Sequence, residues 1–255
     1  MLAHCLPSLL PPTHEHEALQ IAALQSLAGQ DVRACWGQRP WRTPHHSATS
    51  AALVGGGSPP RPGEVSLAHL GVLFLDELPE FRRQALEALR EPLENQRITI
   101  SRAAWQVELD ADFQLIAAMN PCPCGHLGSG LHACRCTPDQ IARYQSRLSG
   151  PFLDRVDMHI EVAPISAQEL LQSAAGEDSA TVRQRCLQAR TVALERQGCC
   201  NARLYAGQEV LPWAEQARTT LKHAAQRWRW SARAVHRCAR VAMTIADLAQ
   251  APRVE

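Results

Sequence analysis

Lysine is nearly absent from this chain. Of its 26 basic residues only Lys222 is a lysine, and the rest are arginines. This scarcity bears on phosphate binding, because the loop G-x-x-x-x-G-K-[ST] needs its lysine to reach the phosphates of a nucleotide. Lys222 lies in a stretch with a helical pattern and no glycine. The 255 residues therefore contain no complete loop of this kind.

Long apolar runs and a strong net charge are also missing. No stretch approaches the roughly 20 apolar residues of a membrane-spanning helix, so we expect no membrane partner. The formal net charge is only +1, which excludes a basic field over the whole molecule. Any contact with nucleic acid must therefore come from a local basic patch.

The segment Gly71–Glu77 is the most informative part of the sequence. Its apolar residues Val72 to Leu75 predict a buried parallel strand, because both faces of such a strand are covered. Asp76 and Glu77 follow at the carboxyl end, where open α/β sheets bind their ligands. This is the form of a Walker B strand, in which the first carboxylate holds Mg²⁺ and the second polarises the attacking water. The sequence thus predicts half of a nucleotide site, which favours a cytoplasmic protein.

Four further segments have the patterns of strands. Phe113–Asn120 predicts a second buried strand that ends in a polar residue. Arg97–Arg102 and the residues from Gln106 to Leu109 predict the two arms of a hairpin, and Ile160–Val162 predicts a third strand. Together with the Walker B strand, they indicate an α/β core.

Helical and loop signals surround these strands. Glu15–Ala28 has helical spacing with Thr13 as its cap, and Arg82–Glu91 predicts a helix that Pro92 stops. Residues 30–66 are loop-rich, with runs of glycine and proline, so we expect no core there; the stretch is long for a loop, which indicates a functional segment or a small insertion. From residue 167 onward the pattern is helical.

Four of the ten cysteines form two closely spaced C-x-C pairs, namely Cys122, Cys124, Cys134 and Cys136. Four thiolates suit the tetrahedral coordination of Zn²⁺, with His126 and His132 as substitute ligands. Any zinc here would be structural. The alternative is four reduced thiols without a metal, and we expect the remaining cysteines to be reduced and inert.

Five segments together carry a dense family resemblance: Arg42–Gly57, Arg61–His69, Gly71–Phe81, Ala117–Gly125 and Leu148–Asp157. They closely resemble the magnesium-chelatase-like AAA+ ATPases, specifically the ComM (YifB) group. In that family a P-loop ending in Gly-Lys-Thr or Gly-Lys-Ser is followed by Met-Leu-Ala and a Leu-Pro segment. This chain starts with Met1-Leu2-Ala3, so the resemblance implies a start just after the P-loop, with the family's N-terminal domain also missing.

The resemblance implies a fold and its domains. We expect an incomplete α/β AAA+ P-loop NTPase core over residues 1–165, without the first strand and Walker A, and with a helix-2 insertion and a pre-sensor 1 hairpin. A linker at residues 166–184 and a small all-helical lid at residues 185–255 should follow. Because the missing strand leaves unpaired backbone groups, we expect the chain to fold poorly alone.

Site residues carry over where the motifs match. Asp76 resembles the Mg²⁺ ligand, Glu77 the catalytic base and Asn120 sensor 1, which orients the attacking water. Arg155 resembles the arginine finger that serves a neighbouring subunit, although it could instead form a surface ion pair with Asp154 or Asp157. The weaker finger candidate is Arg147, and the sensor 2 residue that would contact phosphate from the lid is Arg233.

A DNA contact is implied at two pore elements. The hairpin would contribute Arg97, Arg102 and Trp105, and the helix-2 insertion His45 and His46, since basic and aromatic side chains suit backbone and stacking contacts. The alternative is a structural hairpin at a subunit interface.

The implied function is that of a fragment of a hexameric ring. Its cofactors would be ATP and Mg²⁺, with structural Zn²⁺ in addition, and its partners would be copies of itself and DNA, with no small-molecule substrate besides ATP. ComM-like proteins drive branch migration during natural transformation. Two alternatives stay open: a magnesium-chelatase-type ATPase subunit, and a catalytically dead truncated product, since the Walker A lysine is missing.

Overall fold

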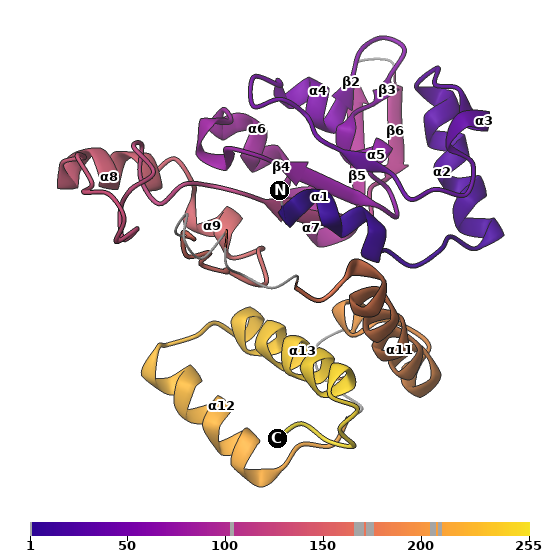
Figure 1. Ribbon diagram of the computed structural model, residues 1–255. Coiled ribbons are helices and arrows are strands. Elements are labelled where there is room, and N and C mark those ends of the chain that lie inside the picture. Colours follow the sequence, from indigo (N-terminus) through magenta and orange to yellow (C-terminus); the bar gives the residue numbers. More distant parts are fainter. Residues whose placement is uncertain (1, 103–104, 166–170, 172–175, 205–207, 209–210) are drawn as a thin grey trace. The chain divides into compact units, whose positions relative to one another are not determined.

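The computed structural model describes residues 2–102, 105–165, 171, 176–204, 208 and 211–255, without the side chains of residues 2 and 102 (Figure 1). The chain divides into two compact units, residues 1–174 and 175–255. The first is a mixed α/β unit and the second is helical. Within the described residues no helix is long and apolar enough to cross a bilayer.

A parallel sheet forms the centre of the first unit. Its strands are β1 (Trp41–Arg42), β4 (Val72–Leu75) and β7 (Gln114–Ala117), in the order β1-β4-β7. Every residue of β4 is buried, which confirms the predicted buried strand. The register pairs Leu75 with Ala117, so β4 and β7 end at the same edge of the sheet.

Two strand predictions were wrong in part. β7 was expected to be buried, yet Gln114 and Ala117 are exposed, because β7 is an edge strand of the described sheet. Ile160–Val162 was expected to be a strand, but residues 156–165 form neither helix nor strand. Ile160 keeps 78% of its surface exposed, since no described strand pairs with this segment.

Residues 30–66 contradict the expectation that this loop-rich stretch contributes no core. They contain α3 (Val32–Cys35), β1, α4 (Ser50–Val54), β2 (Gly55–Gly56), β3 (Arg61–Pro62) and the start of α5 (Glu64–Leu67). Leu53 and Val65 are completely buried in the main core. The glycines permit this close packing, because a Cβ on Gly63 would lie 2.3 Å from the Gly55 nitrogen. Gly55 also has a φ of +101°, which only glycine adopts readily.

The cap of α4 gives a modest stability prediction. The Thr49 hydroxyl accepts a hydrogen bond of 3.2 Å from the Ala52 backbone N–H. We expect Thr49→Ala to lower the free energy of unfolding of the first unit by about 1 kcal/mol, because the N–H then lacks a partner. Urea denaturation would measure this, with Thr49→Ser as the control that keeps the cap. Equal midpoints for the alanine and serine variants would contradict the prediction.

One arginine ties α2 and the segment that precedes it to the rest of the first unit. After α1 (Leu2–Cys5) and η1 (Leu6–Leu9), α2 spans Glu15–Leu27 as predicted. Its cap is His14, whose N–H donates to Glu17, while the Thr13 hydroxyl donates to the Gly37 carbonyl, so the predicted Thr13 cap was wrong. Arg39 is nearly buried and donates to Glu17 and to the carbonyls of Pro11, Pro12 and Leu70.

Pro92 does not stop a helix, as the sequence suggested; it lies in the first turn of one. After η2 (Leu78–Glu80), the chain forms α6 (Arg83–Ala88) and then α7 (Arg90–Asn95). Proline is tolerated in a first turn because N–H groups there have no partner within the helix. The predicted single helix is therefore broken at Leu89.

The predicted hairpin is confirmed. β5 (Arg97–Arg102) and β6 (Trp105–Asp110) pair antiparallel as a separate two-stranded sheet, with Arg97 opposite Asp110. One face contributes Ile98 and Ile100 to the main core, so the hairpin is anchored to the first unit. Further along the chain lie α8 (Pro138–Gln145) and α9 (Gly150–Leu153), and Phe152 of α9 is fully buried.

Within its described residues, the second unit contains three α-helices and a short 3-10 helix. These are α11 (Ser179–Gln197), η3 (Asn201–Arg203), α12 (Glu215–Arg227) and α13 (Ala232–Leu248). α11 begins within residues 166–184, which were predicted to be a linker. A small apolar core surrounds Met243, which is completely buried.

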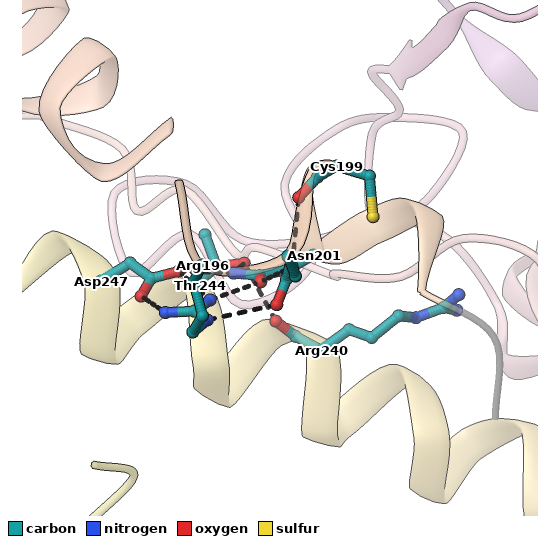
Figure 2. A network of polar contacts seen from close by, with 7 residues as sticks. Arg196, Cys199, Asn201, Arg240, Thr244 and Asp247 are labelled. Carbon is teal, nitrogen blue, oxygen red and sulfur yellow. Dashed lines mark hydrogen bonds and ion pairs between the residues drawn. The ribbon is translucent and has the colours of Figure 1, made fainter. Parts of the chain in front are cut away.

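A polar network joins α11, η3 and α13 (Figure 2). Arg196 donates to both carboxylate oxygens of Asp247, at 2.5 and 2.9 Å, and the Asp247 side chain is only 1% exposed. Asn201 donates to Asp247 and to Thr244, and its carbonyl oxygen accepts from Arg196. Every partner of the buried carboxylate therefore comes from another element, so the network fixes how these elements pack.

Candidate nucleotide and metal sites

The acidic pair lies where the sheet edge predicts. Asp76 and Glu77 follow β4 directly, and both are exposed. Glu77 has a φ of +52°, and its N–H donates to the Asp76 carboxylate over 2.9 Å. Because Glu77 has this left-handed conformation, the alternation of side chains along β4 does not continue through the acidic pair. Two exposed carboxylates at the end of a buried strand can bind a hard cation.

His46 contacts the predicted catalytic base. Its Nδ1 lies 3.0 Å from a carboxylate oxygen of Glu77, and both side chains are partly exposed. His46 therefore lies beside the acidic pair. Its contact with DNA stays a prediction. His45 stacks against the His46 ring, with centroids 4.0 Å apart, and its Nδ1 interacts with Ser47.

Asn120 comes to the same edge of the sheet as the acidic pair. It lies three residues beyond the last residue of β7, and the Leu78 N–H donates to the Ala118 carbonyl over 2.9 Å. Asn120 is exposed. A carboxamide at this edge both donates and accepts hydrogen bonds, so it can orient a water molecule.

Arg155 has a partner that the sequence did not indicate. Its guanidinium donates to Glu94 of α7 and to the Pro151 carbonyl, each over 2.6 Å. The side chain is 14% exposed, and its Nε is buried without a partner in the described structure. A role in a neighbouring subunit would require Arg155 to leave Glu94, and this role stays a prediction.

Arg147 lies beside the loop that follows the acidic pair. It forms an ion pair of 2.8 Å with Glu80 and donates to the Pro79 carbonyl. Arg147 therefore contacts residues that follow the acidic pair closely in the chain, whereas Arg155 contacts α7 and α9. Arg233 lies elsewhere, in the first turn of α13 in the second unit, where it is exposed.

The hairpin residues differ in how available they are. Arg97 forms ion pairs with Glu108 and, at 3.4 Å, with Asp110 of the facing strand, which neutralise its charge. Trp105 is 54% exposed. The side chain of Arg102 lies outside the described part of the chain. The DNA contacts at this hairpin stay a prediction.

The four cysteines of the C-x-C pairs converge on one point. All four sulfurs lie within 4.8 Å of one another, and three of their separations are 3.4, 3.6 and 3.7 Å. Tetrahedral zinc with Zn–S bonds of about 2.3 Å places its sulfurs about 3.8 Å apart. The four thiols therefore fit a tetrahedral ion. His126 and His132 pack against each other instead, with ring centroids 5.1 Å apart.

Backbone groups of the same segment point at these sulfurs. Hydrogen bonds from the Arg135 and His126 backbones lower the pKa of the Cys124 thiol to about 5. Burial and the neighbouring thiols raise the pKa of the Cys136 thiol to about 12. Gly125, with a φ of +78°, turns the chain between the first pair and its loop. The segment is tied down where Gln145 of α8 donates to the Pro121 carbonyl.

Two sets of known proteins match this chain. Residues 1–170 match the family described as magnesium chelatase, subunit ChlI, and residues 176–255 match magnesium chelatase, subunit ChlI C-terminal. The chain is 49% identical over 253 residues to competence protein ComM of Haemophilus influenzae, covering 97% of this chain and 49% of ComM. It is 48% identical over 265 residues to the uncharacterized protein YifB of Salmonella typhimurium, covering 100% of this chain and 51% of YifB. The chain thus spans about half the length of these relatives.

Proposed function

We propose, from the premise that this chain belongs to the magnesium chelatase ChlI family and is ComM-like, that it forms part of an ATP-driven motor acting on DNA. The observation that carries the proposal is the edge of the parallel sheet, where Asp76 and Glu77 follow β4 and Asn120 follows the paired strand β7. Carboxylates beside an amide are what hydrolysis of a nucleotide requires. The proposed motor is cytoplasmic.

Each residue at this edge has a proposed task. Mg²⁺ would supply charge neutralisation on the phosphates, and the exposed carboxylate of Asp76 suits it because Mg²⁺ prefers oxygen ligands. Glu77 would accept the proton of the attacking water, and Asn120 would hold that water in place. His46 keeps the Glu77 carboxylate in position through their 3.0 Å contact.

Binding of ATP also needs phosphate contacts that these residues do not supply. The sequence has no Walker A motif, and its one lysine, Lys222, lies in the helical unit. Without the lysine and backbone amides of a P-loop, phosphate binding loses its main anchor. We therefore expect residues 1–255 alone to hydrolyse ATP at no more than the background rate.

The test uses a version of the protein in which the family's N-terminal domain and P-loop precede Met1. We expect this version to hydrolyse ATP, and Glu77→Gln to lower its turnover by at least about 100-fold, because the amide cannot accept the proton. Phosphate release would be measured with Glu15→Gln, an exposed carboxylate of α2, as the matched control. Full activity of the Glu77→Gln variant would refute the assignment.

The proposed assembly is a hexameric ring in which Arg155 reaches the next subunit's site. Arg155 binds Glu94 in this structure, so the proposal requires the arginine to leave Glu94 and bind the phosphate of the neighbouring subunit's nucleotide. Such an exchange replaces one charged partner by another. Arg233 would contact phosphate from the helical unit, and the hairpin and His45 would face DNA.

We further propose that the four cysteines hold a structural Zn²⁺. The fit of their sulfur separations to a tetrahedral ion supports this, as does the absence of disulfides among the described cysteines. The ion would carry no catalytic step, since all four positions are filled by the protein.

A further inference from the structure

The helical unit carries a long stretch without negative charge. Between Glu215 and Asp247 there is no acidic residue, whereas the stretch contains the basic residues Arg218, Lys222, Arg227, Arg229, Arg233, Arg237 and Arg240. The chain as a whole has a net charge of only +1, so this stretch is a local concentration of positive charge. Such a patch is what a neutral protein needs to bind a polyanion.

Two tryptophans lie in the middle of this stretch. Arg227, the last residue of α12, is followed by Trp228, Arg229 and Trp230, which lead to the Ser231 cap of α13, and we call these four residues the RWRW turn. The rings of Trp228 and Trp230 stack with centroids 5.6 Å apart and an interplanar angle of 27°. The Arg227 guanidinium lies 5.8 Å from the centre of the Trp228 ring. Trp228 nevertheless keeps 59% of its surface exposed.

Four basic side chains of this stretch have no acidic partner among the described residues. Among the described residues, Arg218, Lys222, Arg227 and Arg229 form no ion pair, and all four are exposed. α12 has no buried residue, so its basic residues are not there to cover a core. Two exposed arginines interleaved with stacked indoles therefore need an explanation outside the fold.

The composition of α12 separates the two main classes of anionic partner. A helix that lies on a membrane needs a continuous face of large apolar residues. In α12 the only large aliphatic residue is Leu221, and its other apolar residues are alanines. Single-stranded nucleic acid needs no such face, because its bases stack on aromatic rings while its phosphates contact arginine and lysine.

We infer that the RWRW turn and the adjacent face of α12 form a binding surface for single-stranded nucleic acid. The stacked rings of Trp228 and Trp230 offer a platform to a base, while Arg227, Arg229 and Lys222 contact the phosphates on either side. The inference deepens the proposed action on DNA and rests on it. It assigns the contact to residues separate from the hairpin and from Arg233.

The test measures fluorescence anisotropy of a labelled thymidine oligonucleotide of about 20 nucleotides with the whole chain. We expect Trp228→Ala to weaken binding at least about 5-fold and Trp228→Ala with Trp230→Ala at least about 10-fold, since a stack contributes about 1–3 kcal/mol. Arg227→Ala with Arg229→Ala should reduce the slope of log affinity against log salt by about 1.4. A thermal melt confirms that each variant is folded.

Matched controls remove the same side chains elsewhere. Trp36→Ala removes a tryptophan that is 51% exposed, and Arg82→Ala with Arg83→Ala removes two exposed arginines; neither should change binding. If the RWRW variants bound the oligonucleotide as tightly as wild type while Trp105→Ala lost binding, this inference would be overturned. The proposed DNA function would still stand. If the folded chain bound no oligonucleotide, both would fail. Equal affinity for polyglutamate would also overturn the inference, because that polymer has no bases to stack.

Discussion

Replacing Cys122 with serine should release the zinc ion that we expect the purified chain to carry in a one-to-one ratio. Cys122 is the completely buried member of the four-cysteine group, and its sulfur lies 3.4 Å from Cys124 and 3.7 Å from Cys134. A serine oxygen is a harder ligand than a thiolate and forms shorter bonds to zinc, so it cannot replace the sulfur of Cys122 in a tetrahedral site of four thiolates. Structural zinc sites contribute about 10–16 kcal/mol of apparent binding free energy at neutral pH, which makes this effect large.

Metal analysis of the purified protein would measure the zinc content, and cobalt substitution would report the tetrahedral thiolate geometry in the visible spectrum. The matched control is Cys35→Ser, which replaces an exposed cysteine outside the group. We expect limited proteolysis to cut the segment around residues 122–136 in the Cys122→Ser variant while the main core stays protected. Wild-type protein that contains no zinc after purification in its presence would contradict the prediction.

Replacing Asp247 with alanine should strongly destabilise the helical unit. The substitution leaves the Arg196 guanidinium, only 14% exposed, without its carboxylate, and it also removes an acceptor of Asn201. Breaking a buried ion pair on one side typically costs about 3–5 kcal/mol, because an uncompensated charge stays buried. Amide hydrogen exchange of α11 and α13 would report the loss.

Two further variants test whether the loss of stability comes from the broken ion pair. Glu195→Ala removes an exposed carboxylate on the same helix as Arg196, and we expect a change within about 0.5 kcal/mol. Arg196→Met combined with Asp247→Leu removes both charges and should be clearly less destabilised than Asp247→Ala alone. If the amide hydrogens of α11 and α13 exchanged as slowly in Asp247→Ala as in the wild type, this polar network would not be what stabilises the packing of the two helices.

The same carboxylate predicts a dependence on pH. Burial raises the pKa of Asp247, but the hydrogen bonds from Arg196 and Asn201 and the charge of Arg196 outweigh it, so the pKa lies below its usual range. A carboxylate with a lowered folded-state pKa stabilises the fold above its unfolded pKa. This stabilisation should be lost as the pH falls from the ordinary range of aspartate through the lower folded value, and it should be absent in the double variant.

Local pattern was enough to predict the elements that are self-contained. The strand Val72–Leu75 is apolar throughout because it is covered on both faces, and the hairpin at residues 97–110 pairs within itself. The two C-x-C pairs were close enough in sequence for their convergence to be expected. The hairpin and the cysteine group each lie within one short segment, and the strand Val72–Leu75 shows its burial in its own apolar residues, although it pairs with β1 and β7.

Contacts and burial that depend on distant residues were not predicted from the sequence. Arg155 meets Glu94, which is 61 positions away, and His46 meets Glu77 across 31 positions, so spacing carried no signal for either contact. The glycines and prolines of residues 30–66 indicated loop, yet they allow the close backbone contacts that bury Leu53. Ile160–Val162 has the alternation of a strand, but a strand also needs a partner, and none of the described residues provides one.

The position of the single lysine has a practical consequence. Lys222 is exposed on α12, in the basic stretch that precedes the RWRW turn. An amine-reactive dye or crosslinker would therefore modify only one side chain in the whole chain, without any engineering of the sequence. A label there reports directly on what approaches the helical unit, and a photoreactive group there would identify a bound polymer by covalent capture.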